Sequence, residues 1–402
     1  MGRIETNFKQ TEVGLIPEDW EVKELKDIGE CIIGLTYSPS NVRSYGVLVL
    51  RSSNVQNGRL SFDDNVFVDM DLPQRVIVKE SDILICARNG SKHLIGKCAL
   101  INKKTSGSAF GAFMSVYRGE FPKLVFHQFR SDIIQKQIEE TLGATINQIT
   151  NKDLRSFRVV IPTNKTEQTA IANALSDADG YIESLEKLID KKQKIKQGSL
   201  QQLLKPKENW EVKSIGEVAE VERGASPRPI EDPKWFDNNS LIGWVRISDV
   251  TSSTKILQFT TQKLSDLGIK NSRYVERGNL IMSICATIGR PILTRIDVCI
   301  HDGFVVFRKP TINKEYLYYF LSFIEKDWSK NGQTGSQMNL NTNLIKKTEI
   351  YLPPTKTEQQ QIAQILSDID NEINILNQKL TKAKAIKQGM MQQLLTGKIR
   401  LI

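Results

Sequence analysis

One segment of the chain occurs twice. Residues 161–204 return without gaps as residues 352–395, and about half of the paired positions are identical. A shorter echo pairs Trp20-Glu-Val-Lys23 with Trp210-Glu-Val-Lys213. A repeat of this size reflects one structural unit used twice, so the chain is expected to fold as two related halves. Within each half, a divergent segment precedes a similar one.

The two similar segments are predicted to be long helices. Each follows a proline and opens with a capping pattern, Asn164-x-x-Glu167 or Thr355-x-x-Glu358. Apolar residues then recur at steps of four and three, which is typical of a coiled-coil seam. A lone seam is poorly stable in water, so we expect the two helices to pack against each other, antiparallel, or against a partner protein. The seam residues are Ile171, Leu175, Ile182, Leu185 and Ile189 in the first helix and Ile362, Leu366, Ile369, Ile373, Leu376 and Leu380 in the second.

The divergent segments have a different pattern. Short β-rich runs, such as Ile83-Leu-Ile-Cys86 and Gly303-Phe-Val-Val-Phe-Arg308, are separated by glycine, proline and asparagine. The predicted fold class is therefore α/β (α+β), with two globular domains separated by two long antiparallel coiled-coil helices in a pseudo-two-fold internal repeat. The expected boundaries are 1–160 for the first domain, 161–205 for the first helix, 206–352 for the second domain, and 353–402 for the second helix and the tail.

Charge and cysteine content restrict the class of partner and compartment. Lys and Arg total 55 against 46 Asp and Glu, and the net charge of +9 favours a polyanionic partner such as nucleic acid. The five cysteines form no C-x-x-C pair, which is typical of a reducing compartment. No apolar stretch is long enough to span a membrane. We therefore expect a cytoplasmic protein.

Motifs for catalysis are missing from the sequence. The string from Gly90 to Cys98 resembles a phosphate-binding loop, but it is one residue too long and ends in cysteine. The pair Glu21 and Lys23 matches half of a nuclease metal site, but no suitably spaced aspartate precedes it. The three histidines and the scattered cysteines do not have the spacing of zinc ligands. The chain is therefore expected to be no enzyme and to bind no metal or cofactor.

The repeated motifs resemble a known family. Both helices begin with Pro-x-x-x-Thr-Glu-Gln and end with Lys-Gln-Gly-x-x-Gln-Gln-Leu-Leu, and the N-terminal part of the chain contains Gly14-Leu-Ile-Pro-Glu-Asp-Trp20. These features are similar to the specificity subunit of type I restriction-modification systems over essentially the whole chain. The resemblance implies two target-recognition domains, each reading one half of a split, asymmetric sequence in double-stranded DNA.

The resemblance also implies partner subunits. Two modification subunits would dock on the helices, bind S-adenosylmethionine and methylate adenine at N6. Two restriction subunits, which use ATP and magnesium to translocate and cleave DNA, could join them. The specificity subunit would itself bind none of these cofactors.

Candidate DNA contacts are polar and basic residues in the expected loops. Arginine can bind guanine through two hydrogen bonds, asparagine and glutamine can do so with adenine, and serine or threonine can reach a base or a phosphate. An ordinary solvated loop residue is the alternative at each position. The candidates are Arg51, Ser53, Asn54, Arg88, Asn89, Lys92, Thr145, Asn147 and Gln148 in the first domain and Arg228, Arg246, Ser248, Thr287, Arg290, Ser336, Gln337 and Asn339 in the second.

Other interpretations stay open at the level of sequence. The basic runs 191–196 and 382–387 could contact DNA phosphates or form a solvated helix face. The whole chain could be an adaptor whose coiled coil organises partners and whose domains bind protein. It could also be a DNA enzyme that works without partners, although the missing motifs argue against this.

Overall fold

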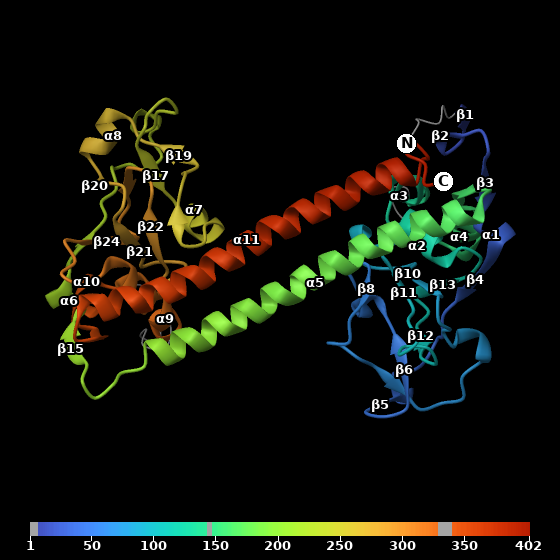
Figure 1. Cartoon of the computed structure of the whole chain (residues 1–402), viewed down its shortest axis with the longest axis horizontal. Helices are drawn as coiled ribbons and strands as arrows, with labels where there is room; N and C mark the ends of the chain where they lie inside the picture. The colour runs from blue at the N-terminus through green and yellow to red at the C-terminus, as the bar shows by residue number, and fades with distance from the viewer. Residues whose placement is uncertain (1–6, 143–146, 329–339) are drawn as a thin grey trace. The chain divides into compact units, whose positions relative to one another are not determined.

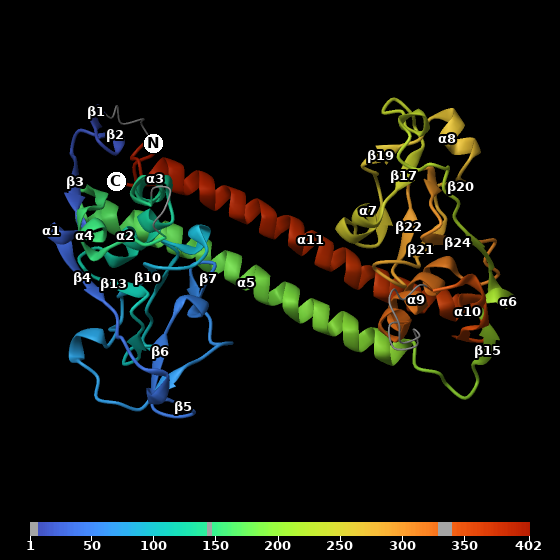
Figure 2. The ribbon, with the colours of Figure 1, turned by 180° about the vertical axis from the view of Figure 1, so that it is seen from behind.

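The computed structural model describes residues 7–142, 147–328 and 340–402, and these form two compact units (Figure 1; seen from behind in Figure 2). Unit 1 comprises Met1–Glu186 and Gln378–Ile402, and unit 2 comprises Lys187–Asn377. The long helices α5 (Lys165–Leu203) and α11 (Lys356–Leu394) each contribute to both units. Each unit therefore contains one globular domain with a segment of both helices.

Unit 1 contains two four-stranded sheets. The first is antiparallel, and its order is β11 (Cys98–Leu100), β10 (Ile83–Cys86), β13 (Met114–Gly119) and β4 (Gly29–Ile33). The second has the order β12 (Ala109–Phe110), β6 (Val47–Leu50), β9 (Phe67–Val68) and β5 (Val42–Arg43), and its β12–β6 pair is parallel.

Smaller elements complete unit 1. Two hairpins are formed by β1 (Phe8–Thr11) with β2 (Gly14–Pro17) and by β7 (Val55–Gln56) with β8 (Arg59–Leu60). A further antiparallel pair joins β3 (Trp20–Glu24) to β14 (Arg158–Pro162). The helices are α1 (Leu25–Ile28), α2 (Pro122–Phe129), α3 (Asp132–Thr141) and α4 (Asn151–Ser156).

Unit 2 repeats this plan. Its larger sheet has the order β16 (Glu220–Arg223), β24 (Phe304–Arg308), β21 (Leu280–Ser283), β22 (Pro291–Thr294) and β18 (Ile256–Leu257). Its second sheet has the order β19 (Gln262–Lys263), β17 (Gly243–Val245), β23 (Val298–Ile300) and β20 (Arg273–Val275), and β17–β23 is parallel. The remaining elements are β15 (Glu211–Ser214), α6 (Ile215–Val218), α7 (Ile247–Ser252), α8 (Asp266–Lys270), α9 (Lys314–Trp328), α10 (Thr342–Lys347) and β25 (Glu349–Leu352).

The strand register makes the two domains comparable residue by residue. In unit 1, Cys86 on β10 lies opposite Met114 on β13, and in unit 2, Ser283 on β21 lies opposite Phe304 on β24. Gly34 donates its backbone N–H to Met114, as Gly224 does to Phe304. A Cβ atom at either glycine would collide with a backbone carbonyl oxygen, so only glycine allows this close approach. The predicted internal repeat of mixed α and β structure is confirmed.

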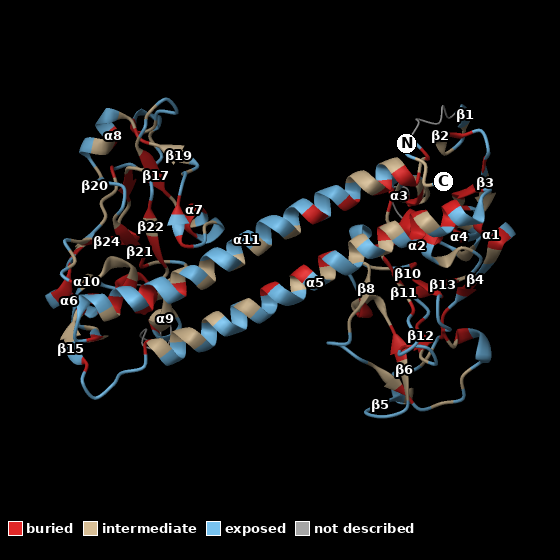
Figure 3. Cartoon of the chain, viewed as in Figure 1, coloured by how far each residue is buried: buried red, intermediate tan, exposed pale blue. Residues whose placement is uncertain are grey.

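The helix segments are part of the domain cores. Ile171 and Leu175 of α5 are fully buried in unit 1 with Leu394 of α11, whereas Ile362 and Leu366 of α11 are buried in the core of unit 2. Figure 3 shows this burial on the helix segments that pack on the sheets. Amphipathic helices gain most of their stability from such tertiary packing. The fold of each domain and its helix segments are therefore one cooperative structure.

The seam residues differ in burial. Ile182, Leu185 and Ile189 on α5 are buried, with at most 8% of each residue exposed. The remaining seam positions of α11 are only half-buried, and these are Ile369, Ile373, Leu376 and Leu380.

Ion pairs establish the direction of the helices within each unit. In unit 1, Asp179 pairs with Lys387 and Glu186 pairs with Lys384. In unit 2, Lys192 pairs with Glu372, and Lys196 pairs with Asp370. The residue number rises along α5 as it falls along α11, so the paired segments are antiparallel, as predicted. Several lysines of the two basic runs are therefore engaged in helix pairing.

The capping prediction was half right. Asn164 accepts a hydrogen bond from the Thr166 N–H, and Thr355 accepts one from the Glu358 N–H, so both caps are present. Glu167, however, is fully buried, and its carboxylate accepts hydrogen bonds from Trp20 Nε1 and from the Arg400 guanidinium. It therefore holds the C-terminal tail against unit 1 rather than completing a capping box.

Candidate nucleic-acid interface

A cleft of about 1330 Å³ lies in unit 1, where the loops after β4, β6 and β10 meet. Its lining includes predicted DNA contacts from three separate parts of the sequence, which the fold brings together. They are Arg51, Ser53, Arg88, Asn89, Asn147 and Gln148. We call this the unit 1 cleft.

The turn after β6 positions Arg51. Its backbone N–H donates to Asn54 Oδ1 at 2.9 Å, and its guanidinium forms an ion pair with Asp64 at 2.8 Å. Asn54 itself is fully buried, and its amide donates to the carbonyls of Ser61 and Asp64. The prediction of Asn54 as a DNA contact is therefore wrong, because its side chain is occupied in holding the turn.

Unit 2 has the same turn after β17. The Arg246 N–H donates to Asp249 Oδ2 at 2.9 Å, and Asp249 is 1% exposed. The other carboxylate oxygen accepts the Thr261 N–H at 3.1 Å. Arg246 thus corresponds to Arg51, and it lines a second cleft of about 610 Å³, the unit 2 cleft, with Phe236 and Gln262.

Arg88 is held differently from Arg51. Its backbone N–H donates to the Phe113 carbonyl at 3.0 Å, and its guanidinium lies 5.2 Å from the centre of the Phe113 ring. Phe113 is 58% exposed, and it lines the unit 1 cleft. Stacking on the Phe113 ring restricts the orientation of the guanidinium but leaves its N–H groups free to donate hydrogen bonds. Within the described residues, no ion pair or hydrogen bond engages that guanidinium.

The corresponding position of unit 2 has different chemistry. Ala87 and Ile284 donate to the carbonyls of Phe113 and Gly303 respectively, so Cys285 and Gly303 stand where unit 1 has Arg88 and Phe113. Next to them, His301 Nδ1 accepts the Gly303 N–H at 2.9 Å, which leaves Nε2 as the donor of a neutral ring. Burial lowers the pKa of His301, although Asp302 opposes this shift. The positions of Arg88 and Phe113, which line the unit 1 cleft, therefore carry different side chains in unit 2, where Cys285, His301 and Gly303 lie outside the cleft lining.

The remaining unit 1 candidates make local contacts. Asn89 Nδ2 donates to Ser52 Oγ at 2.8 Å, and Asn147 Nδ2 donates to the Gly90 carbonyl at 3.3 Å. Gln148 forms an isolated β-bridge with Arg88. Lys92 is exposed but does not line the cleft, and Thr145 lies outside the described residues.

The unit 2 candidates are more scattered. Arg228 is exposed and lies 3.2 Å from Asp302, and Ser248 is exposed beside the Arg246 turn. The Arg290 guanidinium donates to the Ser253 carbonyl at 3.0 Å, and the Thr287 carbonyl accepts the Ser283 hydroxyl. Thr287 and Arg290 do not line the unit 2 cleft. Ser336, Gln337 and Asn339 lie outside the described residues.

Sequence reasoning missed the aromatic and amide groups of both clefts. Tyr37, Gln56 and Phe113 line the unit 1 cleft, and Phe236 and Gln262 line the unit 2 cleft. Aromatic residues within β-rich runs usually belong to the core, so nothing in the sequence alone separated Phe113 from Phe110, which is fully buried.

Neither a metal-binding cluster nor a membrane-spanning helix is found among the described residues. No cluster of three or more histidine, cysteine, aspartate or glutamate side chains there is arranged to hold a metal ion. No helix in those ranges combines the length and the apolar character needed to cross a bilayer.

Comparison with known proteins agrees with this arrangement. The model of the type I restriction modification DNA specificity domain matches residues 17–197 and again residues 207–385. The chain belongs to this family. The predicted resemblance is therefore confirmed, and so is the predicted role in recognising a DNA target on behalf of partner subunits.

Individual relatives support the assignment over the full length. The MjaX specificity subunit of a type I restriction enzyme in Methanocaldococcus jannaschii is 26% identical over 99% of this chain and 97% of its own length. The StySPI specificity subunit of Salmonella potsdam is 23% identical over 96% of this chain and 90% of its own length. A crystal structure of a type I restriction-modification S subunit from M. genitalium has a TM-score of 0.62 at 15% identity, covering 93% of this chain and 96% of that one. This last likeness supports the fold.

Proposed function

We propose that this family member reads a bipartite, asymmetric DNA sequence, with one half-site bound at each cleft. The observation that supports this most directly is the pairing of Arg51 with Arg246 on equivalent turns, beside groups that differ between the units. A shared arginine suits a common contact with guanine or phosphate, whereas Arg88 and its counterpart Cys285 provide different hydrogen-bonding groups. Two different half-sites follow from this difference.

We also propose that the chain directs adenine-N6 methylation, and DNA cleavage where a restriction subunit is present, without catalysing either. Two modification subunits and two restriction subunits would be its protein partners, and S-adenosylmethionine, ATP and magnesium would bind to those partners. The absence of catalytic motifs from the sequence supports this division. We also predict a cytoplasmic location for the chain, because its partner subunits and the DNA would be found there.

The decisive experiment is co-expression with the cognate modification subunit, followed by genome-wide mapping of methylated adenine. We expect one split motif with a fixed number of unread base pairs, which disappears when this chain is omitted. Methylation that is independent of the chain would contradict the proposal. Native mass spectrometry of the same complex tests the expected two modification subunits for each copy of the chain.

Cofactor binding is tested by titrating S-adenosylmethionine into the purified chain and into the complex. Heat of binding is expected from the complex alone. The adaptor alternative is tested by salt, because contacts with phosphates release counterions and make DNA affinity fall steeply with salt concentration. A DNA affinity that does not respond to salt would favour the adaptor.

A further inference from the structure

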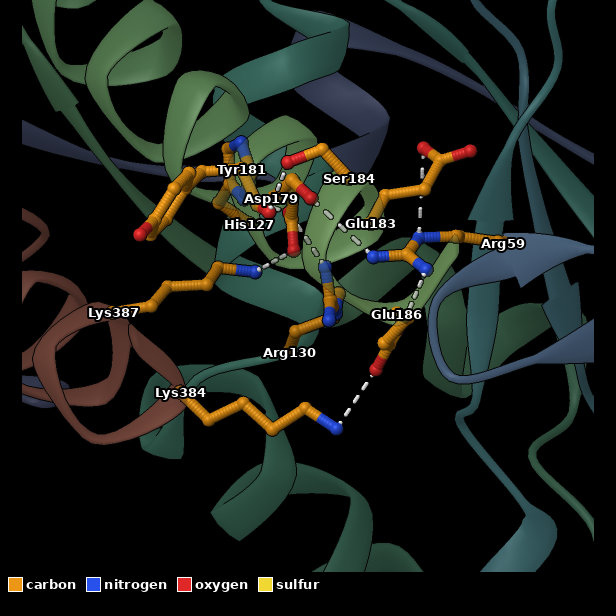
Figure 4. A network of polar contacts seen from close by, with 10 residues as sticks. All are labelled: Arg59, His127, Arg130, Asp179, Tyr181, Glu183, Ser184, Glu186, Lys384 and Lys387. Atoms are coloured by element: carbon orange, nitrogen blue, oxygen red, sulfur yellow. Dashed lines mark hydrogen bonds and ion pairs between the residues drawn. The ribbon is translucent and has the colours of Figure 1, made fainter. Parts of the chain in front are cut away.

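A polar junction, whose side chains range from 6% exposed at Lys387 to 55% at Lys384, lies next to the unit 1 cleft, where the globular domain meets the two helices (Figure 4). It contains two acidic side chains of α5 and four basic side chains that surround them. Its members are Arg59 from β8, Arg130 after α2, Asp179 and Glu186 from α5, and Lys384 and Lys387 from α11. We call this set the unit 1 junction.

Asp179 is the centre of the junction. Its two carboxylate oxygens contact Lys387 Nζ at 2.5 Å and Arg130 Nη1 at 2.8 Å. Only 6% of the Lys387 side chain and 21% of the Asp179 side chain are exposed. Burial acts to raise the pKa of Asp179, but Arg130 and Lys387 outweigh it, so the net shift is downward and the carboxylate is ionised.

Arg59 connects the cleft to this centre. Its guanidinium donates to Glu186 at 2.7 Å and to the backbone carbonyl of Asp179 at 3.3 Å. The hairpin that carries Arg59 follows directly on the Arg51 turn, and its residue Gln56 lines the unit 1 cleft. At the hairpin tip, Gly58 has a φ of +77°, and a Cβ atom there would collide with the Arg130 guanidinium. The hairpin therefore rests directly on the junction.

Unit 2 contains a corresponding junction at the repeated positions. Asp370 pairs with Lys196 at 2.6 Å, and it also accepts a hydrogen bond from the Tyr319 hydroxyl at 2.9 Å. Lys255, next to β18, also reaches a long helix, because its ammonium contacts Ser367 Oγ of α11 at 3.1 Å. It further contacts Tyr319 Oη at 3.2 Å and pairs with Glu315 at 3.0 Å, both on α9. Lys255 follows the Arg246 turn as Arg59 follows the Arg51 turn. Each unit therefore links the stretch after its arginine turn to a long helix, with different side chains and different partners.

Net stability is a poor explanation for these junctions. Taking charges out of water offsets much of their attraction, so a buried pair often stabilises a fold no more than apolar residues would. Directional hydrogen bonds to charged groups do restrict geometry, because they are strong only in a narrow range of distance and angle. We expect loss of one such bond to loosen the hairpin on the helix while the apolar core of the domain stays intact.

We propose that Arg59 and Lys255 are positioning residues, each of which holds a DNA-reading loop in a fixed orientation on the helix pair of its own unit. The inference rests on the proposed bipartite reading of DNA. Each half-site is bound by one of these loops. A loop that is held in a fixed orientation cannot shift to reach a half-site that is one base pair nearer or farther, so the protein accepts only a limited number of unread base pairs. Neither side chain needs to touch DNA for this effect.

The test uses the complex with the modification subunit and DNA duplexes in which the unread spacer is native or one base pair shorter or longer. Variants Arg59→Met, Glu186→Gln and Lys255→Met each remove a junction contact at similar side-chain length. Arg59→Lys keeps the charge, and Lys103→Met is a matched change at an exposed residue of unit 1. For each variant, the discrimination ratio is the methylation rate on the duplex with the native spacer divided by the rate on a duplex with a shorter or longer spacer.

We expect the ratio to fall about tenfold in the first three variants, as for the loss of one hydrogen bond to a charged group. Arg59→Lys should recover part of the ratio, and Lys103→Met should leave it unchanged. An unchanged ratio in both Arg59→Met and Glu186→Gln would overturn the inference, as would an equal loss of methylation on all three duplexes. A wild-type complex that shows no split motif would instead defeat the proposed function.

Discussion

Asp179 on α5 and Lys387 on α11 form an ion pair at 2.5 Å, and the sequence repeat places Asp370 and Lys196 in the same relationship at 2.6 Å. The first pair lies in unit 1 and the second in unit 2. In each pair, the aspartate and the lysine come from different helices. The repeat therefore preserves an interaction between its two copies as well as the fold of each copy.

The exposure of the two lysines predicts unequal effects of mutation. Lys387→Met should destabilise the protein by about 2 kcal/mol, because the Asp179 carboxylate loses one of its two close cationic partners. Arg130 stays bound to Asp179 and limits the loss. Lys196→Met should cost less, since 28% of its side chain is exposed against 6% for Lys387. Urea unfolding of the variants measures the difference. Lys194→Met, at an exposed pair with Asp190, is the control, and a loss there equal to that of Lys387→Met would contradict the argument.

Arg400→Met is expected to have a larger effect. Glu167 is fully buried, and without Arg400 its carboxylate would keep, among the described residues, only the hydrogen bond from Trp20. An uncompensated buried charge costs about 3–5 kcal/mol. The double variant Glu167→Gln with Arg400→Met removes both charges and should recover part of the loss. If the double variant unfolds no later than Arg400→Met, the buried charge is not the cause.

His127 predicts a dependence of stability on pH. Burial lowers its pKa to about 3, and the nearby Lys387 charge adds to the shift. The unfolded chain binds this proton near pH 6.5, so between pH 6.5 and 3 the unfolded state holds more protons and stability falls as pH falls. The contribution lost by pH 5 is about 2 kcal/mol. In His127→Gln, the urea midpoint of unfolding should change less between pH 7 and pH 5 than it does in the wild type. An equal change with pH in both proteins would show that the His127 ring is not responsible.

The unit 1 cleft predicts a change at one half-site only. Arg88→Ala should cost about 1–3 kcal/mol of discrimination at one base pair, the range for a bidentate contact with guanine. Phe113→Leu removes the ring that supports the guanidinium and should weaken the same position to a smaller extent. Methylation mapping reveals both effects. Arg246→Ala should relax the other half-site, and a change at both half-sites in any of these variants would contradict independent reading.

Much of the fold could be predicted from sequence because the repeat and the heptad pattern depend on local spacing. The two helices, their caps at Asn164 and Thr355 and their antiparallel pairing all follow from such patterns. The role of Glu167 could not be predicted, because its partner Arg400 is more than two hundred residues away in sequence.

The candidate DNA contacts were only partly predictable, since loop composition does not show which way a side chain points. Asn54 has the right chemistry for adenine but is buried within its turn, whereas Phe113 was overlooked as a core residue and is exposed. The register of β10 against β13, and of β21 against β24, was needed to align Arg88 with Cys285. That alignment depends on hydrogen bonds between strands distant in sequence.

The discontinuous make-up of unit 1 has a consequence for synthesis on the ribosome. Unit 2 is one uninterrupted stretch, so all of it has been translated before the last 25 residues, Gln378–Ile402, which complete unit 1. Met391, Leu394 and Leu395 belong to the core that surrounds Trp20. The domain that is translated first is therefore completed only after Gln378–Ile402 has been made, and loss of this late segment would damage the early domain rather than unit 2.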